Sequence, residues 1–166
     1  MAFILRKDGS HASHEAFTES WRRYQDYLAS IANRLPAAAR MFALADWHHD
    51  FNDHRAPHDA WIESVLVYET ASGQRQEQRQ AHIKLRLLGA YHDGHIEIEY
   101  ANVVRYCIGA EHRAHGDWGY DEIRISDQGR VLHEIEIGGT TWSIECEDIH
   151  YVWLLHDQGA LDPAMT

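Results

Sequence analysis

The chain has 166 residues, with 26 acidic and 15 basic side chains and a formal net charge of −11 when histidine is neutral. Phosphate backbones and anionic membranes attract concentrated Lys and Arg, so this balance argues against nucleic acid or a membrane as partner. A hydrophobic fraction of 45% in a chain of this length predicts one folded domain, residues 1–166, with a substantial core.

The first quarter of the chain predicts an amphipathic helix at about residues 13–35. Apolar residues recur at spacings of four and three, which places them on one stripe of a helix. They are Phe17, Trp21, Tyr24, Leu28, Ile31 and Leu35. Ser13 is suited to the N-cap, and Pro36 disfavours helical geometry at the residue before it. We expect this stripe to dock on a sheet.

The remainder, about residues 40–156, predicts an antiparallel β region built from hairpins. Residues 41–47 could form a short helix or a strand: the alanines favour a helix, the context favours a strand, and we expect the strand. We interpret 60–70, which is apolar on both faces, as a central strand. The expected fold is therefore α+β: the N-terminal helix packs on an antiparallel, strongly curved sheet of about six to eight strands.

Two hairpins supply the clearest local patterns. Asp93-Gly94 and Gly138-Gly139 both suit two-residue turns. The first turn would place His92 opposite His95, close enough for the two rings to share an ion. The second would put one set of residues on an inward face: His133, Ile135, Ile137, Trp142, Ile144 and Cys146. We expect His133 to be a neutral, hydrogen-bonded core histidine, and Cys146, like Cys107, to be a buried thiol.

Segments 98–106 and 144–152 echo one another, because both place an apolar pair before an Asn or Asp and then another aliphatic residue. An internal duplication of a hairpin would explain the echo. Two strands that obey the same alternation would explain it equally well.

Residues 47–59, WHHDFNDHRAPHD, carry four histidines and four aspartates. Zinc binds His nitrogen and Asp oxygen, so His49, Asp50, His54 and His58 are candidate metal ligands. The spacing fits no HExxH motif, and the proline indicates a loop. In loops, Asp and Asn also bond to their own backbone, which is the alternative explanation for the run.

Acidic residues alternate with the apolar ones in both hairpins. If the hairpins share a sheet, a common solvent face carries Glu97, Glu99, Glu134, Glu136 and Glu145. Such a face would steer a basic protein toward the chain. We also expect the loop 109–121 to present Trp118 to that partner.

In size, acidity, aromatic content and lack of an active-site motif, the chain is similar to small bacterial immunity proteins, which neutralise a partner toxin by covering it. This likeness of general character implies a non-enzymatic module that binds a basic protein and needs no cofactor. It transfers no residue roles. The apolar stretch near the N-terminus is short and ends in charge, which is too little for a signal peptide or a membrane span, so we expect a cytoplasmic protein. The alternative hypothesis is a metal-dependent hydrolase, in which His49, His54 and His58 hold zinc and Asp50 or Asp53 acts as the base.

Overall fold

The structure, a computed structural model, describes residues 2–5, 13–110 and 114–156. The N-terminal helix, α1 (His14–Ile31), continues as a 3-10 turn, η1 (Ala32–Arg34), and is followed by a short helix, α2 (Ala37–Ala43). In the described part of the chain, no helix has both the length and the apolar character needed to cross a bilayer.

Within the described residues, eight strands form two four-stranded antiparallel sheets. The first, sheet A, has the order β1-β2-β3-β8 and contains β1 (Trp61–Ser72), β2 (Gln78–Leu88), β3 (Gly94–Val103) and β8 (Asp148–Leu155). The second, sheet B, has the order β4-β7-β6-β5 and contains β4 (Arg105–Cys107), β7 (Thr140–Cys146), β6 (Val131–Ile137) and β5 (Trp118–Ile125). The α+β class is confirmed. The prediction of one strongly curved sheet was wrong, because the strands form two separate sheets.

A bent two-stranded ribbon joins the two sheets. β3 runs into β4 on one side, and β7 runs into β8 on the other, so each strand passes from one sheet to the other at the same corner. Backbone bonds from Val104 to Glu145 and from Glu147 to Ala101 keep the ribbon paired through the bend. The two echoing segments of the sequence are the two sides of this corner, so their shared pattern corresponds to one shared structural task.

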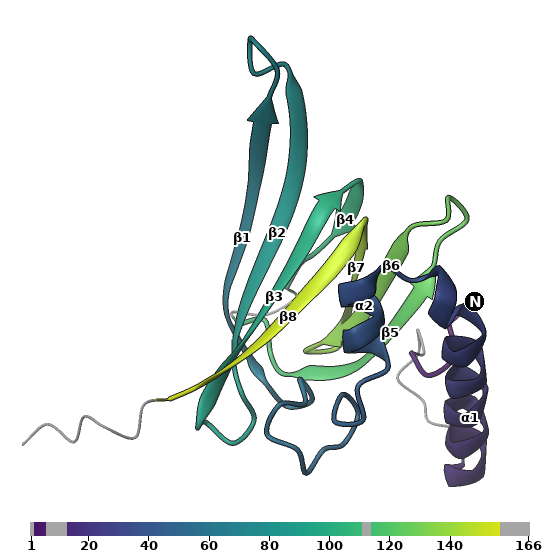
Figure 1. The fold of residues 1–166 in the computed structure, drawn as a ribbon. Helices are drawn as coiled ribbons and strands as arrows, with labels where there is room; N and C mark the ends of the chain where they lie inside the picture. Colours follow the sequence, from purple (N-terminus) through teal and green to yellow (C-terminus); the bar gives the residue numbers. More distant parts are fainter. Residues whose placement is uncertain (1, 6–12, 111–113, 157–166) are drawn as a thin grey trace, which may run out of the picture.

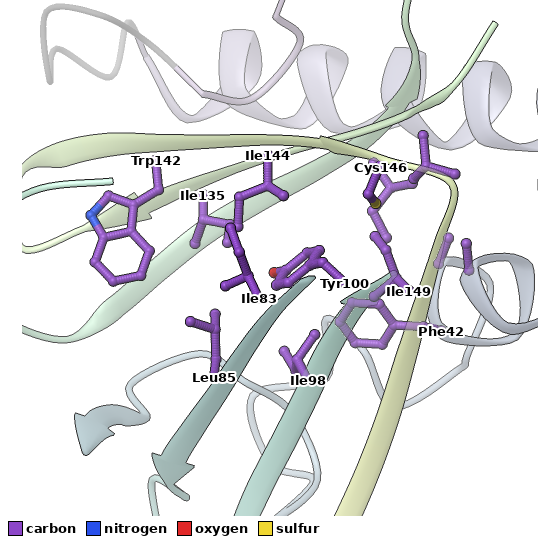
Figure 2. Close-up of a cluster of buried hydrophobic side chains, with 14 of the residues drawn as sticks. Phe42, Ile83, Leu85, Ile98, Tyr100, Ile135, Trp142, Ile144, Cys146 and Ile149 are labelled. Atoms are coloured by element: carbon purple, nitrogen blue, oxygen red, sulfur yellow. The ribbon is translucent and has the colours of Figure 1, made fainter. Parts of the chain in front are cut away.

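The inner faces of the two sheets pack on one another and form the core. Figure 2 shows Ile83, Ile98 and Tyr100 of sheet A pointing toward Ile135 and Ile144 of sheet B. The second hairpin has the predicted register, with Ile137 opposite Thr140, and both of its turn glycines have positive φ, as this turn requires. All six residues predicted on its inner face are buried.

The first hairpin has a different register from the predicted one. Leu88 pairs with His95, because residues 89–93 form a longer turn in place of the two-residue turn at Asp93-Gly94. His92 therefore lies in the turn, with a φ of 58°, and does not oppose His95. The pairing moved by an even number of positions, so residues such as Leu85 and Ile98 keep to the inward face of the sheet.

Two predicted strands were also placed wrongly. Segment 41–47 continues α2 and then forms turns, because its alanines favour helix and its apolar residues follow helical spacing. Segment 60–70 does form a strand, β1, but it lies at the edge of sheet A with many side chains exposed. The strand itself was therefore predicted correctly, but its central position was wrong: β1 is an edge strand with exposed apolar side chains.

The N-terminal region covers the free edge of β5, the outer strand of sheet B. α1 lies along this strand (Figure 1), and the hydroxyl oxygens of Tyr24 and Tyr27 accept hydrogen bonds from the backbone N–H groups of Ile123 and Ile125. One carboxylate oxygen of Glu122 accepts the N–H groups of residues 3–5. The amphipathic helix thus docks on the sheet as predicted, and it also covers the sheet's edge.

Candidate functional site

The most concentrated polar chemistry in the described chain is a buried network centred on Asp121 of β5. Its carboxylate accepts hydrogen bonds from Nε2 of His48 at 3.0 Å, Nε2 of His133 at 2.9 Å and Nε1 of Trp118 at 3.2 Å. His48, Asp121 and His133 are each 2% exposed or less. Buried polar groups are stable when they are bonded to one another, and this network meets that condition.

The partners of His48 determine where its protons lie. Nδ1 faces the backbone carbonyl of Phe42 at 2.9 Å, which can only accept, while Nε2 faces the Asp121 carboxylate. The carbonyl and the ionised carboxylate both accept, so both ring nitrogens of His48 are placed to donate. Burial raises the pKa of Asp121, but the charge of His48 and the bonds from His133 and His48 outweigh it and hold the pKa well below its usual range.

His133 is held as the neutral form by its surroundings. Burial lowers its pKa, and the Asp121 carboxylate opposes that effect only in part. Nε2 donates to Asp121, which leaves Nδ1 to accept from the Tyr100 hydroxyl at 2.9 Å. Burial raises the pKa of Tyr100 well above its ordinary value, so the hydroxyl keeps its proton. The geometry agrees with the predicted neutral, hydrogen-bonded core histidine.

His49 connects this network to the surface. Its ring stacks on that of His48 at 4.1 Å and meets Trp21 edge-on at 4.7 Å. Burial, and then the charge of His48, lower the pKa of His49 to about 4, so the ring is neutral near pH 7. It also lines a cavity of about 290 Å³ between α1 and the end of α2, beside Tyr24 and Asp46. His49 is therefore the member of the cluster that a small solute can approach.

The structure does not bring together the four metal ligands predicted in loop 47–59. His54 bonds to Asp93 at 2.5 Å and stacks on a tyrosine, while His58 pairs with Asp59 and stacks on a phenylalanine. Asp50 accepts the backbone N–H of residue 52, and Asp53 accepts that of residue 55. These local bonds match the alternative explanation of the run, and of the predicted set only His49 belongs to a group of three candidate ligand atoms that lie close together.

The predicted acidic face divides between the two sheets. Because the inner faces meet in the core, the outer faces that carry Glu97 and Glu99 on sheet A and Glu134 and Glu136 on sheet B point away from each other. Several of these carboxylates are also paired. Lys84 and Arg86 bind Glu97 at 2.7 and 2.9 Å, Tyr68 donates to Glu99, and Arg124 pairs with Glu134. The expectation of one shared face was wrong, because the two hairpins belong to different sheets.

Three further placements differ from the sequence-based expectations. Trp118 is fully buried in β5, because its ring lies in the core and its N–H donates to Asp121. Glu145 is buried and paired with Arg105 at 2.9 Å. Cys107 is exposed on the short edge strand β4, whereas Cys146 is buried as expected. Neither Trp118 nor Glu145 is therefore free to meet a partner.

Sequence reasoning missed His48 and Asp121, the centre of the network. Asp121 is in phase with Ile123 on the inward face of β5, and an acid at such a position signals a buried partner. The loop expected at 109–121 includes Asp121, and a loop assignment conceals that phase. Nothing in the local pattern identifies His48, whose partner lies 73 residues away.

Comparisons with known proteins returned no match: no family model fits the sequence, and no curated protein or solved structure matches it.

Proposed function

We propose that the protein is a non-enzymatic binding module that accepts an extended segment of a basic partner protein along the open edge of β1. The observation that carries the proposal is this strand itself. It is 12 residues long and, in the described part of the chain, pairs with β2 alone apart from one bridge at Trp61. An uncovered edge strand presents unpaired N–H and C=O groups to another chain.

The side chains of β1 support the same surface. Trp61, Leu66 and Val67 are 50%, 54% and 41% exposed, although each is apolar and each belongs to this one strand. The β1–β2 hairpin also projects beyond the other strands (Figure 1), so a partner could reach the edge without a clash against sheet B. Added strands gain affinity from main-chain hydrogen bonds and specificity from alternate side chains.

The buried network supports binding over catalysis. His48, Asp121 and His133 bond to each other and to core groups, so their hydrogen-bonding capacity is used inside the protein. A general acid or base must reach the proton that it transfers. This network therefore stabilises the junction between α2 and sheet B.

The net charge of −11 favours a basic partner, because opposite charge steers encounter and raises the association rate. Since the carboxylates of the two hairpins are divided and partly paired, we assign them this long-range role and assign the contact itself to β1. An immunity-type role, in which the partner is a basic toxin, is one form of this proposal.

Site-specific photocrosslinking in the cells that express the chain tests the proposal. Benzoylphenylalanine in place of Val67 should give covalent adducts with a basic protein, and the same probe in place of the exposed Thr141 of β7 should not. The double variant Leu66→Lys with Val67→Lys should lose that partner in affinity capture, while Glu136→Lys should retain it. Adducts from position 141 alone, or capture that survives the β1 variant and fails with Glu136→Lys, would reject the β1 edge.

A further inference from the structure

We infer that His48, His49 and Asp121 form a binding site for a divalent transition-metal cation such as Zn²⁺. Each residue offers one ligand atom, and these three atoms all lie within 4.8 Å of one another. The site is independent of the proposed function, because its ligand residues lie on β5 and in the segment after α2, and none of them belongs to β1.

The type and spacing of the donors fit this class of ion. Two imidazole nitrogens and one carboxylate oxygen are a ligand set that zinc accepts, with bonds of about 2.0–2.2 Å. Donors in a tetrahedral shell then lie roughly 3.3 Å apart. Nε2 of His48 lies 3.0 and 3.2 Å from the two Asp121 oxygens, and Nε2 of His49 lies 3.9 Å from Oδ1. Small movements would close this shell.

Neighbouring groups already orient the ligands. A metal-bound histidine usually donates its other N–H to a carbonyl or carboxylate, and Nδ1 of His48 donates to the Phe42 carbonyl. Asp121 is held by His133 and Trp118. A cation in the site would replace the proton between His48 and Asp121.

His49 supplies the observation that a purely structural network does not explain. Its Nε2 atom is buried yet has no hydrogen-bond partner among the described residues. Buried polar atoms are nearly always bonded, and this nitrogen lies 3.9 Å from Oδ1 of Asp121, so a cation between the two atoms would give both a partner. A cation 2 Å from this nitrogen would satisfy it, by the same roughly tetrahedral geometry.

One movement is needed for binding. The rings of His48 and His49 are stacked, with 9° between their planes, and imidazole lone pairs lie in the ring plane. An ion between the two Nε2 atoms would therefore require the His49 ring to tilt. The cavity beside His49 provides space for that tilt, a path by which the ion enters, and room for a water ligand in the fourth position.

The test titrates the chelator-treated, full-length chain with Zn²⁺ by calorimetry and with Co²⁺ by visible absorption. We expect one tight equivalent and the d–d bands of tetrahedral Co²⁺. His49→Ala should weaken Zn²⁺ binding by at least about 100-fold, the upper end of the loss when a group that merely supports a ligand is removed. His54→Ala and His58→Ala, from the same loop, should bind as the parent chain does.

A second ligand variant, Asp121→Asn, keeps the shape of the carboxylate and should also lose the Co²⁺ bands, with folding checked by circular dichroism. The chain has 14 histidines, so weak binding to surface sites is a real alternative. Weak, multiple binding that His49→Ala leaves unchanged would overturn the inference, as would tight binding that depends on His54 or His58.

Discussion

The outer strands β5 and β1 occupy equivalent places in the two sheets, yet the protein treats them in opposite ways. Two tyrosines of α1 accept the free backbone N–H groups of β5, and Glu122 ties the N-terminal residues beside it. β1 is longer, and in the described chain its outer side carries one backbone bridge at Trp61. Folded proteins usually blunt such edges, so an open one of this length indicates a use.

The other two edge strands, β4 and β8, are also short or covered. β4 has only three residues, and β8 contacts α2, whose first turn donates the N–H of Ala39 to Asp148. The contrast therefore singles out β1 as the place where strand addition would be least hindered.

The largest effect is expected at Glu122. Glu122→Leu removes the acceptor of three backbone N–H groups near the core and should lower the free energy of unfolding by about 4 kcal/mol. Glu122→Gln, which keeps an oxygen in place, should lose much less. Glu69→Leu on β1 breaks an exposed ion pair with Arg79 and should change stability by about 0.5 kcal/mol or less. Urea unfolding measures all three, and equal losses at positions 122 and 69 would contradict the contrast.

The second largest effect is expected from acid, which should lower the free energy of unfolding through His49, beside α1 and β5. The folded pKa of His49 is about 4 against an unfolded value near 6.5, so the unfolded chain alone takes up this proton between those pH values. The contribution of His49 to the free energy of unfolding is therefore fully present above pH 6.5. It is lost as the pH falls toward 4, by about 3 kcal/mol at most.

His49→Gln should make that decline shallower in chelator, measured as urea unfolding between pH 7 and pH 4. His54→Gln, which changes an exposed ring in the same loop, is the matched control and should follow the parent chain. A decline of the same slope in His49→Gln would show that another group carries the acid sensitivity.

A smaller loss is expected from single hydroxyl groups. Tyr24→Phe deprives the N–H of Ile123 of its acceptor inside the protein and should cost about 1–2 kcal/mol. Tyr68→Phe on β1 removes a part-buried hydrogen bond to Glu99 and should cost about 0.5 kcal/mol. Thermal melts of the two variants measure the difference between their losses of stability. Equal losses would mean that the Tyr24 hydroxyl does not stabilise the β5 edge.

The smallest effect on stability is expected on β1 itself. Leu66→Lys and Val67→Lys place charges on side chains that are already exposed, so the free energy of unfolding should change by about 0.5 kcal/mol or less. Added lysines should nevertheless block strand addition. A large loss of stability would mean that these residues pack against something, and it would remove β1 as a free edge.

The sequence predicted what depends on local periodicity and missed what depends on distant partners. The inner face of β6 and β7 followed from alternation, and the helix from its stripe. Even the register error at the first turn left residues such as Leu85 and Ile98 facing inward, because an even shift preserves the face. The order of the strands is not local, so β1 was taken for a central strand.

The same distinction holds for the site. His133 follows the inward phase of its strand and was predicted correctly as a core residue. His48 and Asp121 meet across 73 residues, and their pairing depends on how α2 and β5 pack. The many histidines of residues 47–59 suggested a metal site, but most polar groups of this segment take part in local turns and ring stacks.

Residue-resolved hydrogen exchange tests the central claim most directly. In the free chain, the amides of Ile123 and Ile125 should be protected, and the amides of β1 that do not pair with β2 should exchange within the earliest time points. Addition of the protein captured through position 67 should protect those β1 amides and leave sheet B unchanged. Slow exchange along both sides of β1 in the free chain, or new protection confined to sheet B, would contradict the account.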